Sequence, residues 1–140
     1  MKPPLGDTLV ICDMDNTLLT AKEGIPACNR AVIRLYTSLG GLFTVATGRP
    51  PESIRAALGD IRLSLPAISC NGALLYDFST ESVLHRATLN REQATTAILD
   101  ILNKFPRVGV EVMAGNGEMY VIHANDCLLY TSPSPRDRSV

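Results

Sequence analysis

The feature that most constrains the fold of this chain is a short apolar run that ends in two acids. Residues 8–12 read Thr-Leu-Val-Ile-Cys, and Asp13 and Asp15 follow with only Met14 between them. Such a run predicts a buried strand. Because burying one carboxylate is costly and burying two together costs more, we expect both acids at the end of that strand, where a ligand can offset their charge.

Strand-like and helix-like segments alternate through the first half of the chain. Apolar runs predict strands at 8–13, 42–46 and 66–70, and periodic patterns predict helices at 26–39 and 51–58. The first helix opens with Pro26, ends at Gly40-Gly41 and carries apolar residues at helical spacing, namely Ala27, Ala31, Ile33, Leu35 and Leu39. This order favours an α/β fold with a parallel sheet.

The second half has a different, α+β pattern. Residues 72–77 and 82–86 predict a β-hairpin, and residues 108–113 and 118–123 predict another around Asn116-Gly117. Between the hairpins, residues 90–105 predict a helix capped by Asn90, with an apolar face of Ala94, Ala97, Ile98, Ile101, Leu102 and Phe105. We therefore expect one domain over residues 1–87 and the start of a second over 88–126.

Composition indicates an ordinary soluble globular protein. The 140 residues are 46% hydrophobic and 19% charged, with a formal net charge of -1 and no basic patch, which argues against nucleic-acid binding. The apolar stretches are short and the N-terminus lacks the apolar segment of a signal peptide, so we expect no membrane association and a cytoplasmic location. The four cysteines form no C-x-x-C pair, and we assign structural roles to Cys12 and Cys70.

Residues 127–140 differ in character from the rest of the chain. They contain Ser-Pro-Ser-Pro and no helical or strand periodicity, which is typical of a flexible terminus or of a peptide ligand for a partner domain. The segment from Cys127 to Asp137 also resembles the translation of a transposase-type sequencing-library adapter. On that interpretation 127–140 is a non-native, disordered tail, and the natural sequence continues differently after Asp126.

Three ordered motifs carry the resemblance to a known family. They are Asp13-Met14-Asp15-Asn16-Thr17-Leu18-Leu19, then Val45-Ala46-Thr47-Gly48-Arg49-Pro50, then Ile68-Ser69-Cys70-Asn71-Gly72-Ala73, each at the end of a predicted strand. Together they resemble the Cof-type branch of the haloacid dehalogenase (HAD) superfamily over residues 8–126. The resemblance implies a Rossmann-like core, of which this chain holds the N-terminal part, and the start of an α+β cap domain of class IIB.

The resemblance also implies roles for individual residues. Asp13 would be the nucleophile and a Mg²⁺ ligand, and Asp15 the general acid and base with its backbone carbonyl on the metal. Substrate phosphate would lie at Thr47, Gly48, Arg49 and Asn71. The implied activity is Mg²⁺-dependent hydrolysis of small phosphorylated metabolites such as sugar phosphates through an aspartyl-phosphate, with no obligate protein partner. These roles suit the chemistry, since Mg²⁺ prefers oxygen ligands and a carboxylate can attack phosphorus.

Other interpretations remain open at this point. Taken alone, Asp13 and Asp15, Thr47-Gly48-Arg49 and Asn71-Gly72 each fit an ordinary turn. Asn16 replaces the glycine of many family members but tolerates positive φ. The family's later lysine and acidic metal motif have no counterpart after Asp126. The alternatives are therefore a phosphosugar mutase of the same superfamily or a non-catalytic fragment, and we expect low activity and marginal stability from this chain.

Overall fold

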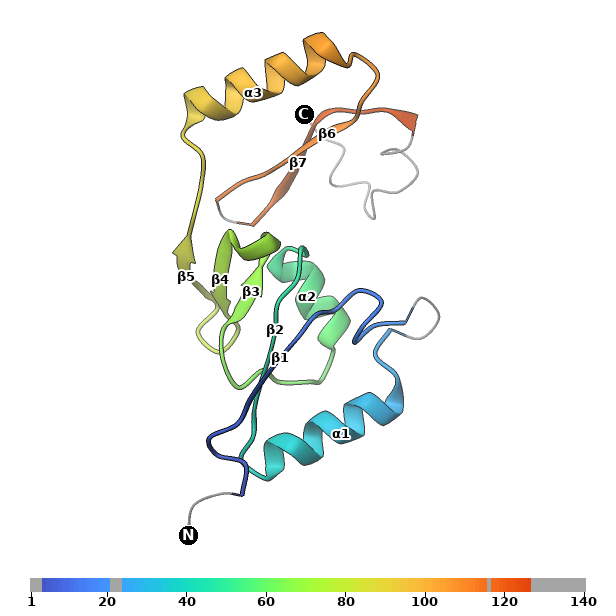
Figure 1. Cartoon of the computed structure of the whole chain (residues 1–140), viewed down its shortest axis with the longest axis vertical. Helices are drawn as coiled ribbons and strands as arrows, with labels where there is room; N and C mark the ends of the chain where they lie inside the picture. Colours follow the sequence, from blue (N-terminus) through green and yellow to red (C-terminus); the bar gives the residue numbers. More distant parts are fainter. Residues whose placement is uncertain (1–3, 21–23, 116, 127–140) are drawn as a thin grey trace. The chain divides into compact units, whose positions relative to one another are not determined.

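The computed structural model describes residues 4–20, 24–115 and 117–126, which fall into two compact units (Figure 1). The first unit spans residues 1–86 and the second spans residues 87–140. The predicted tail at 127–140 and Asn116 of the predicted second hairpin turn lie outside the described residues. The assignment of 88–126 to a cap domain stays a prediction.

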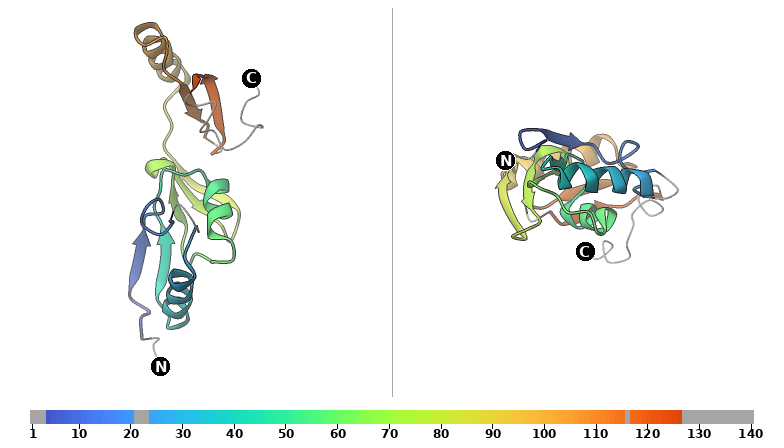
Figure 2. Two further views of the ribbon diagram at one scale, coloured as in Figure 1. Left: turned by 90° about the vertical axis from the view of Figure 1, so that its right-hand side faces the viewer. Right: turned by 90° about the horizontal axis from the view of Figure 1, so that it is seen from below.

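The first unit is built on parallel strands connected by helices. Its elements are β1 (Leu9–Cys12), α1 (Ala27–Ser38), β2 (Leu42–Val45), α2 (Pro51–Leu58) and β3 (Ala67–Ser69). β1 pairs in parallel with β2, and a parallel bridge from Ala46 to Ile68 continues the order to β3. Both helices lie on one face of β1 and β2 (Figure 2), because right-handed crossovers that step in one direction place their helices on the same side. The predicted α/β fold with a parallel sheet is confirmed.

An antiparallel extension completes the first unit. A single 3₁₀ turn (Cys70–Gly72) leads from β3 into β4 (Leu74–Asp77), and β5 (Ser82–Arg86) returns beside β4. The predicted hairpin over 72–86 is therefore confirmed.

The core of the first unit lies between the helices and the sheet. It is formed by Met14, Leu18, Leu19, Ile25, Ile33, Phe43, Val45, Ile54, Leu58, Ile61 and Ala67.

The prediction that the first strand is buried is wrong. Leu9, Val10 and Ile11 are 45%, 40% and 51% exposed. β1 pairs with β2 along one edge, and within the described ranges no strand pairs with its other edge. On α1, only Ile33 is buried among the five apolar residues that the sequence places at helical spacing, and the other four are exposed. Apolar composition identifies the strand, whereas burial depends on what packs against it.

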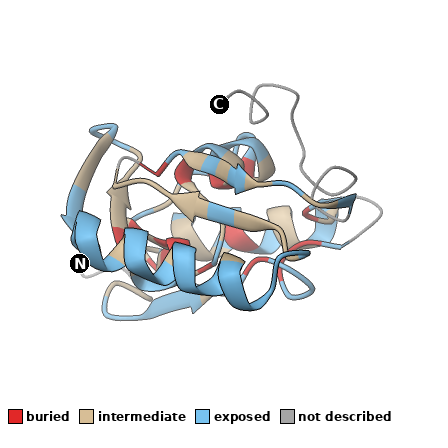
Figure 3. Cartoon of the chain, turned by 90° about the horizontal axis from the view of Figure 1, so that it is seen from above, coloured by how far each residue is buried: buried red, intermediate tan, exposed pale blue. Residues whose placement is uncertain are grey.

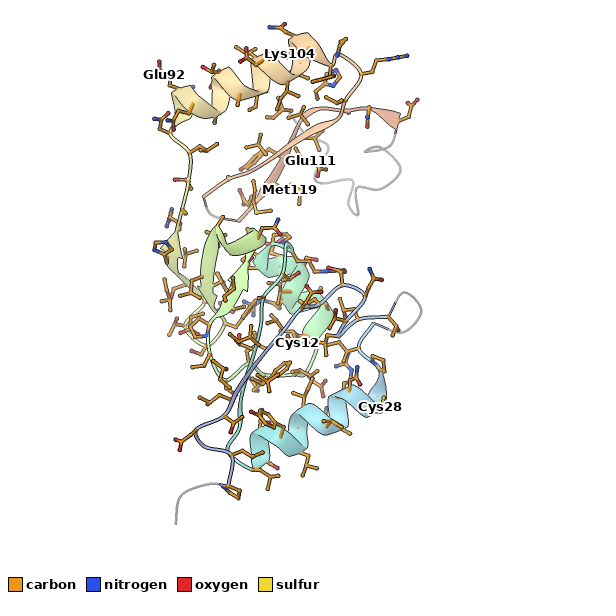
Figure 4. The ribbon with its side chains drawn as sticks, in the orientation of Figure 1. Cys12, Cys28, Glu92, Lys104, Glu111 and Met119 are labelled. Carbon is orange, nitrogen blue, oxygen red and sulfur yellow. The ribbon has the colours of Figure 1, made fainter. Side chains whose placement is uncertain are left out.

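The second unit contains α3 (Arg91–Lys104) and an antiparallel pair, β6 (Val110–Met113) and β7 (Met119–His123). Asn90 caps α3 as predicted, because its side-chain oxygen accepts a hydrogen bond of 2.8 Å from the amide of Gln93. Glu92 lies in the first turn and Lys104 in the last, at opposite ends of the helix (Figure 4), which suits the helix dipole.

The predicted apolar face of α3 is only partly covered in the structure. The helix has no buried residue and is exposed along most of its length (Figure 3). Ala94, Ile98 and Leu102 are half-buried, while Ile101 and Phe105 are exposed. Periodicity located this helix, but the described residues cover only part of its apolar face.

Two further expectations concern membranes and thiols. None of the helices in the described part of the chain has the length and apolar character that crossing a bilayer requires. Cys12, Cys28 and Cys70 are free thiols, and Figure 4 shows Cys12 and Cys28 on separate elements. Burial and the neighbouring charge of Asp13 raise the pKa of the Cys12 thiol, which makes it less reactive and agrees with a structural role.

Candidate active site

Asp13 and Asp15 lie in a tight turn directly after β1. Between them Met14 is fully buried, and its carbonyl oxygen accepts hydrogen bonds from the amides of Leu18 (3.0 Å) and Leu19 (2.8 Å). Because Met14 anchors the turn in the core, the acids on either side of it are exposed. Asn16 has a φ of 59°, so asparagine supplies here the positive φ that the sequence predicted it could tolerate.

The Asp13 carboxylate is held by its own turn. Thr17 Oγ1 donates a hydrogen bond of 3.1 Å to Asp13 Oδ2. Thr17 belongs to the first motif, and this bond explains why a hydroxyl four residues after the acid is useful there, since it fixes the carboxylate without neutralising it.

Two loops from the neighbouring strands are joined by backbone hydrogen bonds. The amide of Asn71 donates to the carbonyl of Thr47 (3.1 Å), and the amide of Cys70 donates to the carbonyl of Arg49 (3.2 Å). Three successive residues here, Cys70, Asn71 and Gly72, have φ values of 56°, 55° and 89°. Such a run is costly for residues other than glycine, and it directs the amides of Cys70 and Asn71 toward the loop after β2.

Side-chain packing brings Gly48 and Asn71 together. A Cβ atom at Gly48 would lie 3.0 Å from Asn71 Oδ1 and 3.2 Å from Asn71 Nδ2, so the missing side chain makes room for this amide. Next to them Thr47 is buried, and its Oγ1 accepts a hydrogen bond of 3.3 Å from the amide of Arg49. Three of the predicted phosphate-binding residues, Thr47, Gly48 and Asn71, therefore form one contiguous group.

Arg49 and Asp15 form a bidentate ion pair. Arg49 Nε donates to Asp15 Oδ2 (2.9 Å), and Arg49 Nη2 donates to Asp15 Oδ1 (2.7 Å). The hydrogen bond from Arg49, aided by its charge and opposed by partial desolvation, lowers the pKa of Asp15 below its ordinary value. The same bond raises the pKa of Arg49. Asp15 is consequently a carboxylate at neutral pH in this arrangement.

A pocket of about 630 Å³ opens beside the ion pair. It is lined by Asp15, Asn16, Leu19, Thr20, Gly24, Arg30, Arg49, Ala56 and Ala57. Asp15 and Arg49 thus border a space large enough for part of a small organic molecule.

The donor set for a metal ion consists of carboxylate and carbonyl oxygens. Among the described residues no group of three or more His, Cys, Asp or Glu side chains is placed to hold a metal. Mg²⁺ is commonly bound through one or two carboxylates, with water and substrate phosphate as its other ligands. An exposed Asp13 with the nearby backbone of Asp15 fits that pattern, whereas a zinc or calcium cage does not fit.

Sequence reasoning did not identify the residues that support these groups. Ser53 Oγ accepts a hydrogen bond of 2.9 Å from Arg49 Nη1, and Ser69 Oγ donates one of 2.7 Å to the carbonyl of Arg49. Ser53 lies four residues after Arg49, in the first turn of α2, and this spacing is the one signal that could have identified it. Ser69 is polar yet lies in an apolar strand, which is a weaker signal.

Comparison with known proteins agrees with this geometry. Residues 10–137 match the family of haloacid dehalogenase-like hydrolases. The chain belongs to this family. The predicted resemblance is confirmed.

Relatives in this family are named as phosphatases. The 5-amino-6-(5-phospho-D-ribitylamino)uracil phosphatase YwtE of Bacillus subtilis is 37% identical over 93 residues, which are 66% of this chain and 31% of YwtE. The pyridoxal phosphate phosphatase YbhA of Escherichia coli is 27% identical over 126 residues, 90% of this chain and 42% of YbhA. The chain therefore spans about a third to two-fifths of these HAD relatives.

Solved structures share the fold of this chain. The subclass IIB sugar phosphatase BT4131 superposes with a TM-score of 0.74 at 21% identity, over 90% of this chain and 48% of BT4131. SMU.1108c of Streptococcus mutans gives a TM-score of 0.72 at 22% identity, over 90% of this chain and 47% of its own. The α/β arrangement of the first unit is thus the HAD fold.

Proposed function

We propose that the protein is a Mg²⁺-dependent phosphomonoesterase that hydrolyses small phosphorylated metabolites through an aspartyl-phosphate on Asp13. The observation that carries the proposal is the arrangement of two exposed acids in the turn after β1, with Asp15 bonded to the loop that holds Thr47 and Gly48. The names of YwtE and YbhA, both phosphatases of small phosphorylated compounds, support the substrate class.

The proposed reaction has two steps that use the acids differently. In the first, an oxygen of Asp13 attacks phosphorus, the bond to the leaving oxygen breaks, and Asp15 gives that oxygen a proton. In the second, water attacks the phosphorus of the aspartyl-phosphate, Asp15 takes a proton from the water, and the bond to Asp13 breaks to release inorganic phosphate. The ion pair with Arg49 presents Asp15 as a carboxylate, which is the form that the second step needs. Before the first step Asp15 must take up the proton that it gives to the leaving oxygen, and the proton that it takes from water in the second step restores that protonated state for the next turnover.

The loops after β2 and β3 would receive the transferring phosphoryl group. Thr47 and Asn71 are joined by a backbone hydrogen bond, and the Asn71 side chain lies against Gly48. The Thr47 hydroxyl and the Asn71 amide side chain would act as donors, because positioned donors stabilise the charge that develops on phosphoryl oxygens. Mg²⁺ would be held by Asp13 and the backbone carbonyl of Asp15, where it supplies positive charge against the phosphate and the two acids.

The test is hydrolysis of p-nitrophenyl phosphate by the chain with Mg²⁺ and with EDTA. We expect turnover that requires Mg²⁺ and falls at least a hundredfold in Asp13→Asn. Asp100→Asn on α3 is the matched control, because it removes one exposed acid from the second unit. Turnover that persists in Asp13→Asn would refute the assignment of the nucleophile, and a folded chain without turnover would favour the non-catalytic alternative for this length of sequence.

A further inference from the structure

The guanidinium group of Arg49 is engaged by protein acceptors on all three of its nitrogen atoms. Nε and Nη2 each donate to one oxygen of Asp15, at 2.9 and 2.7 Å, and Nη1 donates to Ser53 Oγ at 2.9 Å. Both carboxylate oxygens of Asp15 are therefore bonded, and both bonds come from one planar group. A bidentate contact with a planar guanidinium fixes the orientation of a carboxylate as well as its distance from the guanidinium.

The backbone of Arg49 is fixed as well. Its amide donates to Thr47 Oγ1 (3.3 Å), and its carbonyl accepts hydrogen bonds from Ser69 Oγ (2.7 Å) and from the amide of Cys70 (3.2 Å). Ser69 is completely buried. The side chain of Arg49 thus starts from a rigid point in the loop after β2 and ends against Ser53 in the first turn of α2.

These contacts leave Arg49 poorly suited to hold a phosphate. A guanidinium has five N–H donors, and three of them are bonded to Asp15 and Ser53 here. The three include the adjacent Nε and Nη2 donors, which together could bind a phosphate in a bidentate manner. We propose that Arg49, supported by Ser53, is a positioning residue that aims the Asp15 carboxylate, and that it is not a ligand of the substrate phosphate. This inference rests on the proposed function, and it assigns Arg49 a role different from the one that the sequence implied.

Stability alone does not account for the arrangement. The side chains of Asp15 and Arg49 are 52% and 33% exposed, and ion pairs in contact with solvent contribute little to folding. Arg55 lies on α2, as Ser53 does, and pairs with Glu81 at 3.0 Å. That pair contacts none of the site residues, so Arg55→Lys is a matched control that changes an arginine ion pair away from the acids.

The first test is ¹⁵N NMR of the Arg49 Nε–H group, with its signal assigned by its loss in Arg49→Lys. We expect the signal to move in Asp15→Asn, to stay unchanged in Arg55→Lys, and to stay unchanged when Mg²⁺ and inorganic phosphate are added. If the Arg49 Nε–H chemical shift does not change in Asp15→Asn, the proposal is wrong. The proposal is also wrong if this shift changes when phosphate is added. This readout requires no turnover.

The second test separates orientation from phosphate binding in p-nitrophenyl phosphate hydrolysis. We expect Arg49→Ala to lower kcat about tenfold, with partial recovery in added guanidinium chloride, while the inhibition constant of inorganic phosphate changes less than twofold. In an Asp15→Asn background, Arg49→Ala should cause no further loss, because the two residues act as one unit. A tenfold weaker phosphate inhibition with unchanged kcat would show a phosphate ligand and overturn the proposal.

If the protein is not a phosphatase that uses Asp13, the experiments give results different from those that would disprove the role of Arg49. In that case Asp13→Asn would leave the hydrolysis unchanged, or the amides of Thr47 and Asn71 would not respond to phosphate. The Arg49 Nε–H signal would still report whether the pair with Asp15 exists in solution.

Discussion

Replacing Ser69 by alanine tests whether one buried hydroxyl organises the active-site loops. Ser69 is fully buried at the end of β3, and its hydroxyl donates to the carbonyl oxygen of Arg49 over 2.7 Å. The same carbonyl also accepts a hydrogen bond from the amide of Cys70. Ser69→Ala therefore removes one of the two donors to this carbonyl and leaves no orphaned carbonyl; it also removes the 3.2 Å contact between Ser69 Oγ and Cys70 Sγ.

The expected loss of stability follows from the number of hydrogen-bond donors that the Arg49 carbonyl keeps. A hydrogen bond contributes about 1 kcal/mol net, and a buried group left without a partner costs about 1–3 kcal/mol. Because the amide of Cys70 remains, the lower figure of about 1 kcal/mol applies. For a chain of this size that corresponds to a decrease in Tm of about 4 °C.

Thr44→Val provides the control for the loss of a buried hydroxyl. Thr44 is buried in β2, and its Oγ1 lies 3.1 Å and 2.9 Å from the carbonyl oxygens of Leu65 and Pro66, away from the acids. We expect both variants to lower the Tm measured by circular dichroism, Thr44→Val by at least as much as Ser69→Ala because its hydroxyl lies against two carbonyls. Only Ser69→Ala should shift the Nε–H signal of Arg49. Equal effects of the two variants on that signal, or an unchanged Tm in Ser69→Ala, would refute the reasoning.

Three further predictions concern charge and space. Because the folded-state pKa of Asp15 lies below its unfolded value, its ion pair stabilises the fold above about pH 4 and loses this effect as the pH falls through the folded pKa. The loss of stability in Arg49→Gln, measured by urea unfolding, should therefore be small, as for other exposed ion pairs, and should vanish in strong acid. Arg30 is 28% exposed and donates to two backbone carbonyls and a carboxylate, so Arg30→Ala should lower the free energy of urea unfolding by about 2 kcal/mol. Arg34 is 61% exposed, so Arg34→Ala should lower it by less than about 0.5 kcal/mol. Gly48→Ala should displace the amide side chain opposite it and weaken phosphate inhibition about tenfold with unchanged Tm, and unchanged inhibition would contradict the close approach.

The sequence was sufficient for most element boundaries in this chain. The predicted helix at 51–58 coincides with α2, because a proline in its first turn and a glycine after its last residue mark both ends. Burial was predicted less well. Leu9 and Ile11 are as apolar as the residues of β2, yet they are exposed, since burial depends on contacts from elements far away in the sequence.

The candidate site was predicted in its members but not in its connections. The motifs identified Asp15 and Arg49 separately, 34 residues apart, and nothing in either motif indicates that the two side chains bond to each other. Ser53 and Ser69 were missed because a serine is informative only once its neighbours in space are known. The proposed roles of Asp13, Thr47 and Asn71 stay predictions for the kinetic experiments.

The backbone hydrogen bonds between the loops after β2 and β3 have a consequence for redesign. The bonds from the amides of Cys70 and Asn71 to the carbonyls of Arg49 and Thr47 do not depend on which side chains those residues carry. The distance between the loops is therefore set independently of the groups displayed on them. A substitution at the exposed Asn71 would therefore change the group presented to the phosphoryl oxygens without separating the loops, provided that the new residue accepts a left-handed backbone.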